Sequence, residues 1–157
     1  MLCLSYCNKK KFIKAGLFFG IIVFDQTTKW IAQRYLNGEI FFVIPKIFSF
    51  KLYQNYSTIL GIYLNPVLFY IFVVFLLLFL LAIYQKNPNF LSKAPKLYFV
   101  LVAGGAISNI IDRIRFGYII DFVSFSYFQS EAIFNLADCA IVAGTVLIAW
   151  KIFIREK

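Results

Sequence analysis

Histidine is absent from this sequence of 157 residues, and cysteine occurs only three times. The absence of histidine excludes a Ser-His-Asp or Cys-His catalytic site and removes the commonest metal ligand. The cysteines (Cys3, Cys7 and Cys139) are odd in number and lack the spacing of a disulfide framework. These absences leave carboxylates as the candidates for acid and base chemistry.

Acidic residues are also scarce, since seven Asp and Glu stand against sixteen Lys and Arg, for a formal net charge of +9. The basic residues form short clusters between apolar segments, which is typical of membrane orientation signals. They do not form a stripe with interleaved aromatic residues, so no nucleic-acid partner is expected. With 62% hydrophobic residues and a mean hydropathy of +0.80, the chain is expected to be a single integral membrane domain over residues 1–157.

Four segments are apolar enough and close enough to the required 20 or so residues to cross a membrane. The third contains Gly104 and Gly105, small residues that allow helices to approach closely. The first lacks a small-residue cleavage site, so it is interpreted as an anchor and not as a removed signal peptide. We therefore expect an all-α membrane protein with four transmembrane helices, at about 12–31, 66–84, 97–114 and 133–154.

Clusters of Lys and Arg before the first segment, between the second and third, and after the fourth place both termini on the cytoplasmic side. The loops on the opposite side, 40–60 and 117–128, are rich in β-branched and aromatic residues, which favour short strands. They predict a small extracytoplasmic sheet on the membrane surface. An amphipathic interfacial helix near 125–132 is an alternative for part of the second loop.

Eight polar or charged residues stand in or beside the apolar segments, where such groups are costly and usually serve a function. In the predicted topology all of them come together near the outer face of the membrane. They are Asp25, Lys29, Asn109, Asp112, Arg113, Asp121, Asn135 and Asp138.

Asp121 and Asp138 are the candidate catalytic pair, because two neighbouring carboxylates that share a proton can divide the acid and base roles. The structural alternative is that Asp138 caps the fourth helix and Asp121 pairs with a lysine. Asn135 and Asp138 are three residues apart, so they share a helix face. Asp25 and Lys29 have the i, i+4 spacing of a simple intrahelical ion pair.

The remaining polar residues have two interpretations each. Asn109 shares a helix face with Asp112 and Arg113, which could support a catalytic group or simply join helices. Arg113 is expected to pair with a carboxylate such as Asp25 or Asp112. Asn55, in an apolar outer loop, could bind a substrate backbone or complete a turn.

Four segments carry a resemblance that covers nearly the whole chain: DQTTK at 25–29, QNYSTILG at 54–61, GGAISNIIDRIRFGYIIDF at 104–122 and FNLAD at 134–138. In these segments the sequence resembles the bacterial lipoprotein signal peptidases, the type II signal peptidases. The resemblance implies an aspartic endopeptidase in the cytoplasmic (inner) membrane. Its substrate would be a prolipoprotein that carries diacylglycerol on a cysteine, cut just before that cysteine.

The resemblance also implies residue roles. It implies that Asp121 and Asp138 are catalytic and that the outer loops correspond to a β-cradle and a periplasmic helix. No metal or organic cofactor is expected. Prolipoprotein and membrane lipid would be the partners of a monomer. Ser57, Thr58 and Ser108 depart from the family pattern, in which small residues or glycine are usual. The implied supporting residues are Asp25, Lys29, Asn55, Asn109, Asp112, Arg113 and Asn135.

Two other functions compete with proteolysis. Buried Asp, Lys and Arg also mark ion paths in transporters and channels. Such a path should carry polar groups through the whole bilayer, and segment 66–84 offers no charged residue. A non-enzymatic scaffold, in which the polar cluster only joins helices, would keep its function when Asp138 is replaced by asparagine.

Overall fold

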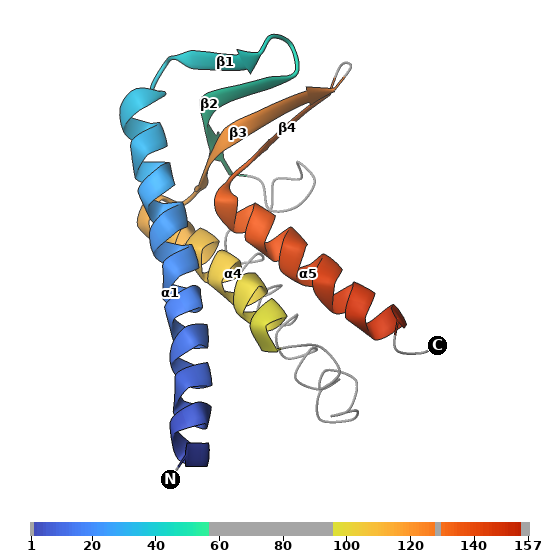
Figure 1. Cartoon of the computed structure of the whole chain (residues 1–157). Coiled ribbons are helices and arrows are strands. Elements are labelled where there is room, and N and C mark those ends of the chain that lie inside the picture. Colours follow the sequence, from blue (N-terminus) through green and yellow to red (C-terminus); the bar gives the residue numbers. More distant parts are fainter. Residues whose placement is uncertain (1, 57–95, 128–129, 155–157) are drawn as a thin grey trace.

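The computed structural model describes residues 2–56, 96–127 and 130–154 (Figure 1). Their order along the chain is helix, two strands, helix, two strands and helix. The segment expected to cross the membrane at 66–84, and the departures at Ser57 and Thr58, lie outside the described residues. The elements are α1 (Leu2–Tyr35), β1 (Ile40–Ile44), β2 (Phe48–Asn55), α4 (Lys96–Phe116), β3 (Ile119–Tyr127), β4 (Ser130–Phe134) and α5 (Leu136–Ile154).

Glycines bring the three helices into close contact. Gly104 of α4 lies against Ile21 of α1, and a side chain at Gly105 would collide with the carbonyl oxygen of Ala137 in α5. Further along, a side chain at Gly144 of α5 would meet the carbonyl oxygen of Tyr98 in α4 at 2.8 Å. The close helix contact predicted from Gly104 and Gly105 is thus confirmed, with one glycine facing each neighbouring helix.

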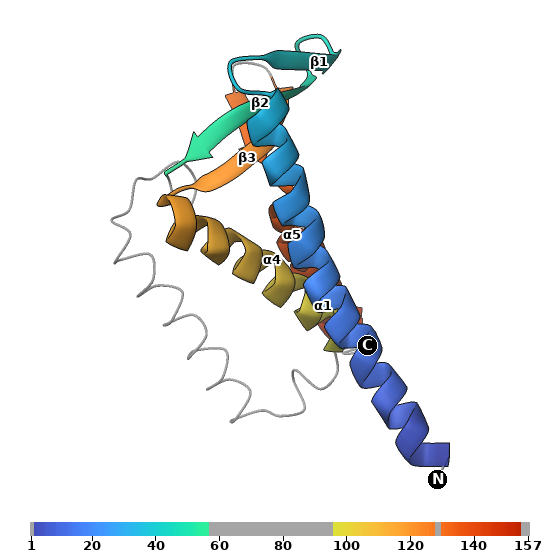
Figure 2. The same ribbon diagram turned by 90° about the vertical axis from the view of Figure 1, so that its left-hand side faces the viewer.

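A four-stranded antiparallel sheet, in the order β1-β2-β3-β4, lies at one end of the helices. Both ribbon views place it where α1 and α4 end and α5 begins (Figures 1 and 2). The strands predicted within 40–60 and 117–128 are confirmed. The described residues are therefore a combination of helices and a sheet, and the expectation of an essentially all-α protein underestimated the sheet.

The alternative of a helix near 125–132 is wrong. Strand β3 continues to Tyr127 and pairs with β4, with Phe125 opposite Ala132 and Ser126 opposite Glu131. The alternation of apolar and polar residues in VSFSY has the period of a strand and not that of a helix. The hairpin formed by β3 and β4 takes up the residues that an interfacial helix would need.

The helix boundaries differ from the expected membrane segments. The segment expected at 133–154 becomes helical only at Leu136, because Ile133 and Phe134 pair with Ser124 and Val123 in the sheet. Helix α1 extends beyond 12–31 at both ends, whereas α4 agrees with 97–114 to within two residues.

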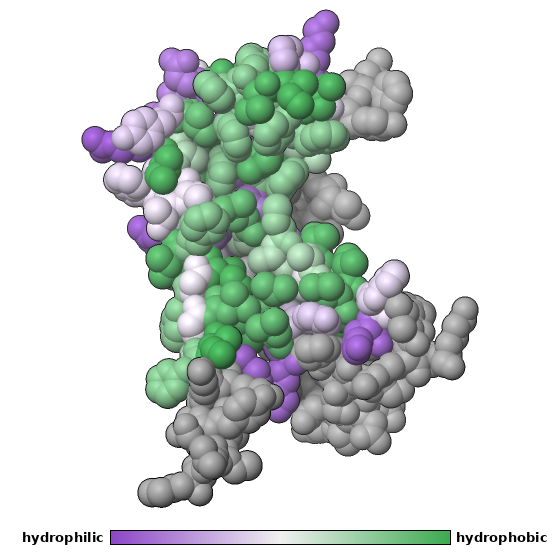
Figure 3. All heavy atoms as spheres, in the orientation of Figure 1, coloured by the Kyte–Doolittle hydropathy of each residue, from purple (hydrophilic) through white to green (hydrophobic). Residues whose placement is uncertain are grey.

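Among the described residues, α4 is the one helix long and apolar enough to cross a membrane by length and composition, and α5 contains a shorter apolar stretch, Leu136–Ile148. The arrangement of four membrane-spanning helices remains a prediction. In the orientation of Figure 1, hydrophobic residues cover much of the described surface, the sheet included (Figure 3). All five residues of β1 are exposed.

The small core lies between the end of α1 and the sheet. Ala32 of α1 packs with Phe122 and Val123 of β3. Helix α4 ends at Phe116, and the next residue, Gly117, has a φ of +80° and donates its N–H to the carbonyl oxygen of Arg113 at 3.0 Å. Gly117 thus adopts a left-handed backbone conformation that ends the helix and leads directly into β3. This turn and the core together fix the position of β3, the strand that carries Asp121.

We predict that Gly105→Ala destabilises the protein by about 1–3 kcal/mol, because the new methyl group overpacks the contact between α4 and α5. Gly20→Ala is the matched control, since nothing lies within 4 Å of a side chain there. In detergent, Gly105→Ala should lower the midpoint of unfolding, while Gly20→Ala should leave the midpoint unchanged or raise it slightly. Equal stability of the two variants would contradict the close helix contact.

Candidate active site

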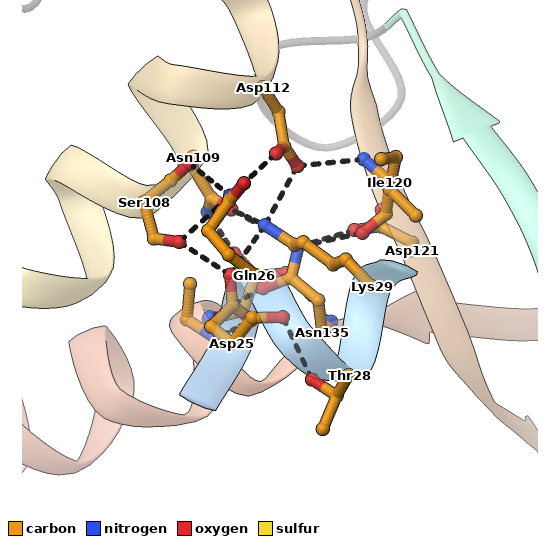
Figure 4. A network of polar contacts seen from close by, with 12 residues as sticks. Asp25, Gln26, Thr28, Lys29, Ser108, Asn109, Asp112, Ile120, Asp121 and Asn135 are labelled. Atoms are coloured by element: carbon orange, nitrogen blue, oxygen red, sulfur yellow. Dashed lines mark hydrogen bonds and ion pairs between the residues drawn. The ribbon is translucent and has the colours of Figure 1, made fainter. Parts of the chain in front are cut away.

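A buried lysine lies at the centre of a polar network between the helices (Figure 4). The Nζ atom of Lys29 is 2.7 Å from Oδ2 of Asp25 and 2.8 Å from Oδ2 of Asp112. It also donates to Oδ1 of Asn109 at 2.8 Å. An ammonium group has three N–H donors, so all three have an acceptor here, two of them charged. The ammonium charge is thereby compensated although Lys29 is only 1% exposed.

The two carboxylates beside Lys29 each fix the backbone of another element. Oδ1 of Asp25 accepts the N–H of Ala137 in the first turn of α5 at 2.8 Å. Oδ2 of Asp112 accepts the N–H of Ile120 in β3 at 3.2 Å. The ion pairs of Lys29 therefore determine where α5 and β3 begin, and with them the positions of Asp138 and Asp121.

Asp138 belongs to a reciprocal hydrogen-bond pair at the start of α5. Asn135 accepts the N–H of Asp138 with Oδ1 at 2.9 Å, and Asp138 accepts the N–H of Asn135 with Oδ2 at 3.2 Å. This is a capping box, which satisfies two N–H groups that would otherwise have no partner in the helix. The positive end of the helix dipole further favours a carboxylate at this position.

Asp121 is completely buried in β3 and receives its hydrogen bonds from two amides. Asn135 donates from Nδ2 to Oδ1 at 2.6 Å, and Asn55 donates from Nδ2 to Oδ2 at 2.8 Å. Burial, with a smaller contribution from the charge of Asp138, raises the pKa of Asp121 to about 7, against the lowering effect of the hydrogen bond from Asn55. Asp121 is therefore poised to exchange a proton near neutral pH.

Asn109 connects the lysine to both candidate catalytic carboxylates. Its Oδ1 accepts from Lys29 and, at 3.2 Å, from Nδ2 of Asn135. Its Nδ2 donates to Oδ1 of Asp138 at 2.8 Å. Because Lys29 can only donate, the oxygen of the Asn109 amide must face it, and the NH₂ group must face Asp138. Lys29 thus sets the orientation of a hydrogen-bond donor at Asp138.

Eight of the nine residues that the sequence singled out join this network: Asp25, Lys29, Asn55, Asn109, Asp112, Asp121, Asn135 and Asp138. Arg113 was expected to pair with Asp25 or Asp112, and that expectation is wrong. Those carboxylates form ion pairs with Lys29, and Arg113 donates from Nη1 to the carbonyl oxygen of Tyr56 at 3.2 Å.

The structure shows the structural half of the alternatives left open by the sequence. Asp25 and Lys29 form the intrahelical ion pair and Asp138 caps its helix, and all three residues are in addition part of the wider network, while their roles in catalysis remain a prediction. The hydrogen bonds on the carboxylate of Asp121 come from amides and not from a lysine. Asn55 donates to Asp121, a contact that neither alternative included, and its binding of a substrate backbone remains a prediction.

Sequence reasoning missed the contribution of Gln26 and Ser108. Gln26 donates from Nε2 to Oδ1 of Asp112 at 2.7 Å, and the hydroxyl of Ser108 donates to Oδ2 of Asp25 at 2.7 Å. Gln26 also donates to the Ser108 hydroxyl, at 3.1 Å. Gln26 is uncharged and did not stand out, although it directly follows Asp25, and Ser108 was noted only as a departure from the family pattern and not for a hydrogen bond.

An apolar groove of about 760 Å³ runs along α5 from Asp138. Its described walls are formed by β4 and α5, and Asp138 is one of the residues that line it. The lining side chains besides Asp138 are Phe134, Cys139, Val142, Ala143, Val146 and Leu147. An apolar chain lying in this groove would reach the polar network at its end.

The fold and the site place the chain in the class of bacterial membrane enzymes. It is similar to a solved bacterial membrane enzyme with a TM-score of 0.75 and 26% identity, over 92% of this chain and 90% of that one. A second such structure gives a TM-score of 0.69 and 27% identity, over 88% of this chain and 90% of that one.

The particular family follows from the sequence comparisons. The family described as signal peptidase (SPase) II matches residues 17–154. Over 134 residues the chain is 37% identical to the lipoprotein signal peptidase of Clostridium tetani, which covers 81% of this chain and 83% of the relative. The lipoprotein signal peptidase of Caldanaerobacter subterraneus is 33% identical over 86% of this chain and 92% of the relative. The chain belongs to the signal peptidase II family.

We predict that Lys29→Met destabilises the protein by about 3–5 kcal/mol, because it leaves the buried carboxylates of Asp25 and Asp112 without their cation. Methionine keeps the apolar stem, so packing is little changed. Unfolding of the variant in detergent measures the loss. A double variant, Lys29→Met with Asp112→Asn, should recover part of it, and no recovery would show that charge compensation is not the cause.

Proposed function

We propose that this protein removes signal peptides from prolipoproteins as a membrane aspartic endopeptidase, with Asp121 and Asp138 as its catalytic pair. The observation that carries the proposal is Asn135, whose side chain donates to the carboxylate of Asp121 and whose backbone N–H donates to the carboxylate of Asp138. One residue thus bonds two carboxylates that come from different elements. Membership of the signal peptidase II family supports the same reaction.

We infer different roles for the two carboxylates. Asp138 lies at the positive end of α5 and accepts from a backbone N–H and from Asn109, contacts that offset part of the cost of burying its ionised form. Asp121 is completely buried in β3, and its pKa of about 7 leaves it partly protonated at neutral pH. Asp138 would then act as the base and Asp121 as the acid.

The proposed reaction is general acid–base hydrolysis. Asp138 takes a proton from a water molecule, whose oxygen attacks the scissile carbonyl carbon. Asp121 gives its proton to the carbonyl oxygen, which forms a tetrahedral intermediate. When this collapses, the C–N bond breaks and the proton acquired by Asp138 passes to the leaving amine. Asp121 regains its proton as the carbonyl reforms, so both carboxyl groups return to their starting states.

The apolar groove beside Asp138 supports a substrate with a lipid-modified cysteine. A chain with two acyl groups stays in the bilayer, because each buried CH₂ contributes about 0.8 kcal/mol. Its cleavage site must therefore be met at the membrane surface, and cleavage just before the diacylglyceryl cysteine fits a site at the end of an apolar groove. The supporting residues in this proposal are Asp25, Lys29, Asn55, Asn109, Asp112, Arg113 and Asn135.

We further propose the membrane arrangement expected from the sequence. The chain forms one peptidase domain over residues 1–157, a monomer in the bacterial inner membrane with four spans and both termini in the cytoplasm. The network and the sheet then lie near the outer face, where water reaches the bilayer surface. The network residues lie late in α1 and α4 and at the start of α5, which supports a hydrolytic site and argues against a transport path.

We predict that Asp121→Asn and Asp138→Asn each leave a folded protein that cannot cleave a diacylglyceryl prolipoprotein in detergent. Asparagine keeps the shape of the side chain but can neither accept nor donate the proton. Cleavage is followed by the size of the product, with an unlipidated prolipoprotein as the control substrate. Ser49→Ala, a buried change in β2 remote from the polar network, should retain activity. Near-normal turnover by either Asn variant would contradict the catalytic roles of the two aspartates and would support the alternative in which the polar cluster only joins helices.

A second prediction concerns pH. Because Asp121 must hold its proton, kcat should fall as pH rises through about 7, the pKa of that carboxyl group. Asn55→Ala removes a hydrogen bond that favours the ionised carboxylate, so the pKa should rise and the alkaline limb of the kcat profile should move to higher pH. Tyr53→Phe, directly opposite Asp121 in the sheet, is the matched control. A limb that stays in place or moves to lower pH in Asn55→Ala would contradict the acid role of Asp121.

A further inference from the structure

A second apolar cavity, of about 250 Å³, lies between the end of α1 and the sheet. Helix α1 lines one side of it, and β1, β2 and β3 contribute one aromatic side chain each. Its lining residues are Ile31, Ala32, Tyr35, Phe41, Phe50 and Phe122, together with Thr28 and Leu36 of α1. An engineered cavity of about 150 Å³ with a lining of this kind takes up benzene, so this cavity has room for a longer stretch of hydrocarbon.

The cavity is separate from the candidate active site. Phe122 lines it, whereas the preceding residue, Asp121, belongs to the polar network. Successive side chains of a strand point to opposite faces, so β3 stands between the two. The groove beside Asp138 has different walls, formed by β4 and α5. A substrate lying in that groove would not enter the cavity behind β3.

The cavity is continuous with the exposed apolar surface of α1. Ile31 and Tyr35 line it and are nevertheless 44% and 65% exposed, and Phe24 and Trp30 on the same helix are exposed as well. Exposed Trp and Tyr near a helix end are typical of the boundary between membrane and water. The guanidinium group of Arg34 lies 5.9 Å from the centre of the Trp30 ring, so a positive charge lies beside this exposed aromatic residue near the end of α1.

We propose that the cavity binds an acyl chain of a membrane phospholipid, with the headgroup near Arg34. Apolar walls suit hydrocarbon, the exposed side of α1 supplies the path from the bilayer, and the cation suits a headgroup phosphate. The bound chain packs against Phe122, the neighbour of Asp121, and fills the space beneath the sheet. The occupant is a lipid of the bilayer and not the diacylglyceryl group of the substrate, because β3 lies between the cavity and Asp121.

Photolabelling of the full chain tests this assignment. The protein is placed in bilayers of phosphatidylethanolamine and phosphatidylglycerol that contain a trace of phosphatidylethanolamine with a diazirine at one acyl chain end. Light should label Phe50 and Phe122, inside the cavity, at least as strongly as the exposed residues Phe19 and Phe24 of α1. Labels confined to exposed positions of α1, with none on Phe50 or Phe122, would overturn the proposal.

Two variants and a second probe sharpen the result. Ile31→Trp narrows the cavity and should reduce labelling of Phe50 and Phe122 at least fivefold, whereas Phe24→Trp, outside the cavity, should leave it unchanged. Unchanged labelling in both variants would also overturn the proposal. The same diazirine on a diacylglyceryl peptide should label the groove beside Asp138. If that peptide labels the cavity more strongly than the phospholipid does, the cavity belongs to the substrate. Labelling requires no catalysis, so it is independent of the proposed reaction.

Discussion

The site depends on one buried ammonium group. Lys29 is hydrogen-bonded to Asp25 from its own helix and to Asp112 and Asn109 from α4. A buried ion is costly unless it is paired and hydrogen-bonded, and here each N–H of the ammonium has an acceptor. Its two carboxylate partners also bind the backbone of α5 and of β3. Removing the lysine would therefore disturb the start of both elements that carry a candidate catalytic aspartate.

The same hydrogen bonds serve structure and chemistry together. Asn135 caps α5 and donates to Asp121, and Asp138 completes the cap and accepts from Asn109. The structural and the catalytic interpretations of Asp138 are thus not exclusive. A carboxylate held by a helix cap has a fixed position and a favourable electric field, which is the preorganisation that a general base needs. Asp121, buried and held by amides, lies in a different environment, and this difference is the basis for proposing different roles for the two carboxylates.

Much of the site could be predicted from the sequence, because charged residues are rare in so apolar a chain and each therefore stood out. The i, i+4 pair of Asp25 and Lys29 followed from helix geometry alone. The capping box could have been found, since an Asn three residues before an Asp precedes an apolar run. The partner of Arg113 could not, because the choice between lysine and arginine depends on tertiary distances. The hydrogen bonds of Ser108 and Gln26 could not be predicted, since neutral polar residues in a helix more often bond to nearby backbone. The start of α5 was misplaced because Ile133 and Phe134 suit a strand and an apolar helix equally well.

The most direct measurement is solid-state NMR of the protein in bilayers, with labelled Lys, Asp and Asn side chains. The account predicts a charged Lys29 Nζ in contact with the carboxyl carbons of two aspartates, Asp25 and Asp112, and with the side-chain carbonyl carbon of Asn109. Substituting Lys29 would remove this set of correlations and identify it. A neutral Lys29, or one in contact with Asp25 alone, would contradict the claim that a single ammonium group holds α1 and α4 together and fixes the two aspartates.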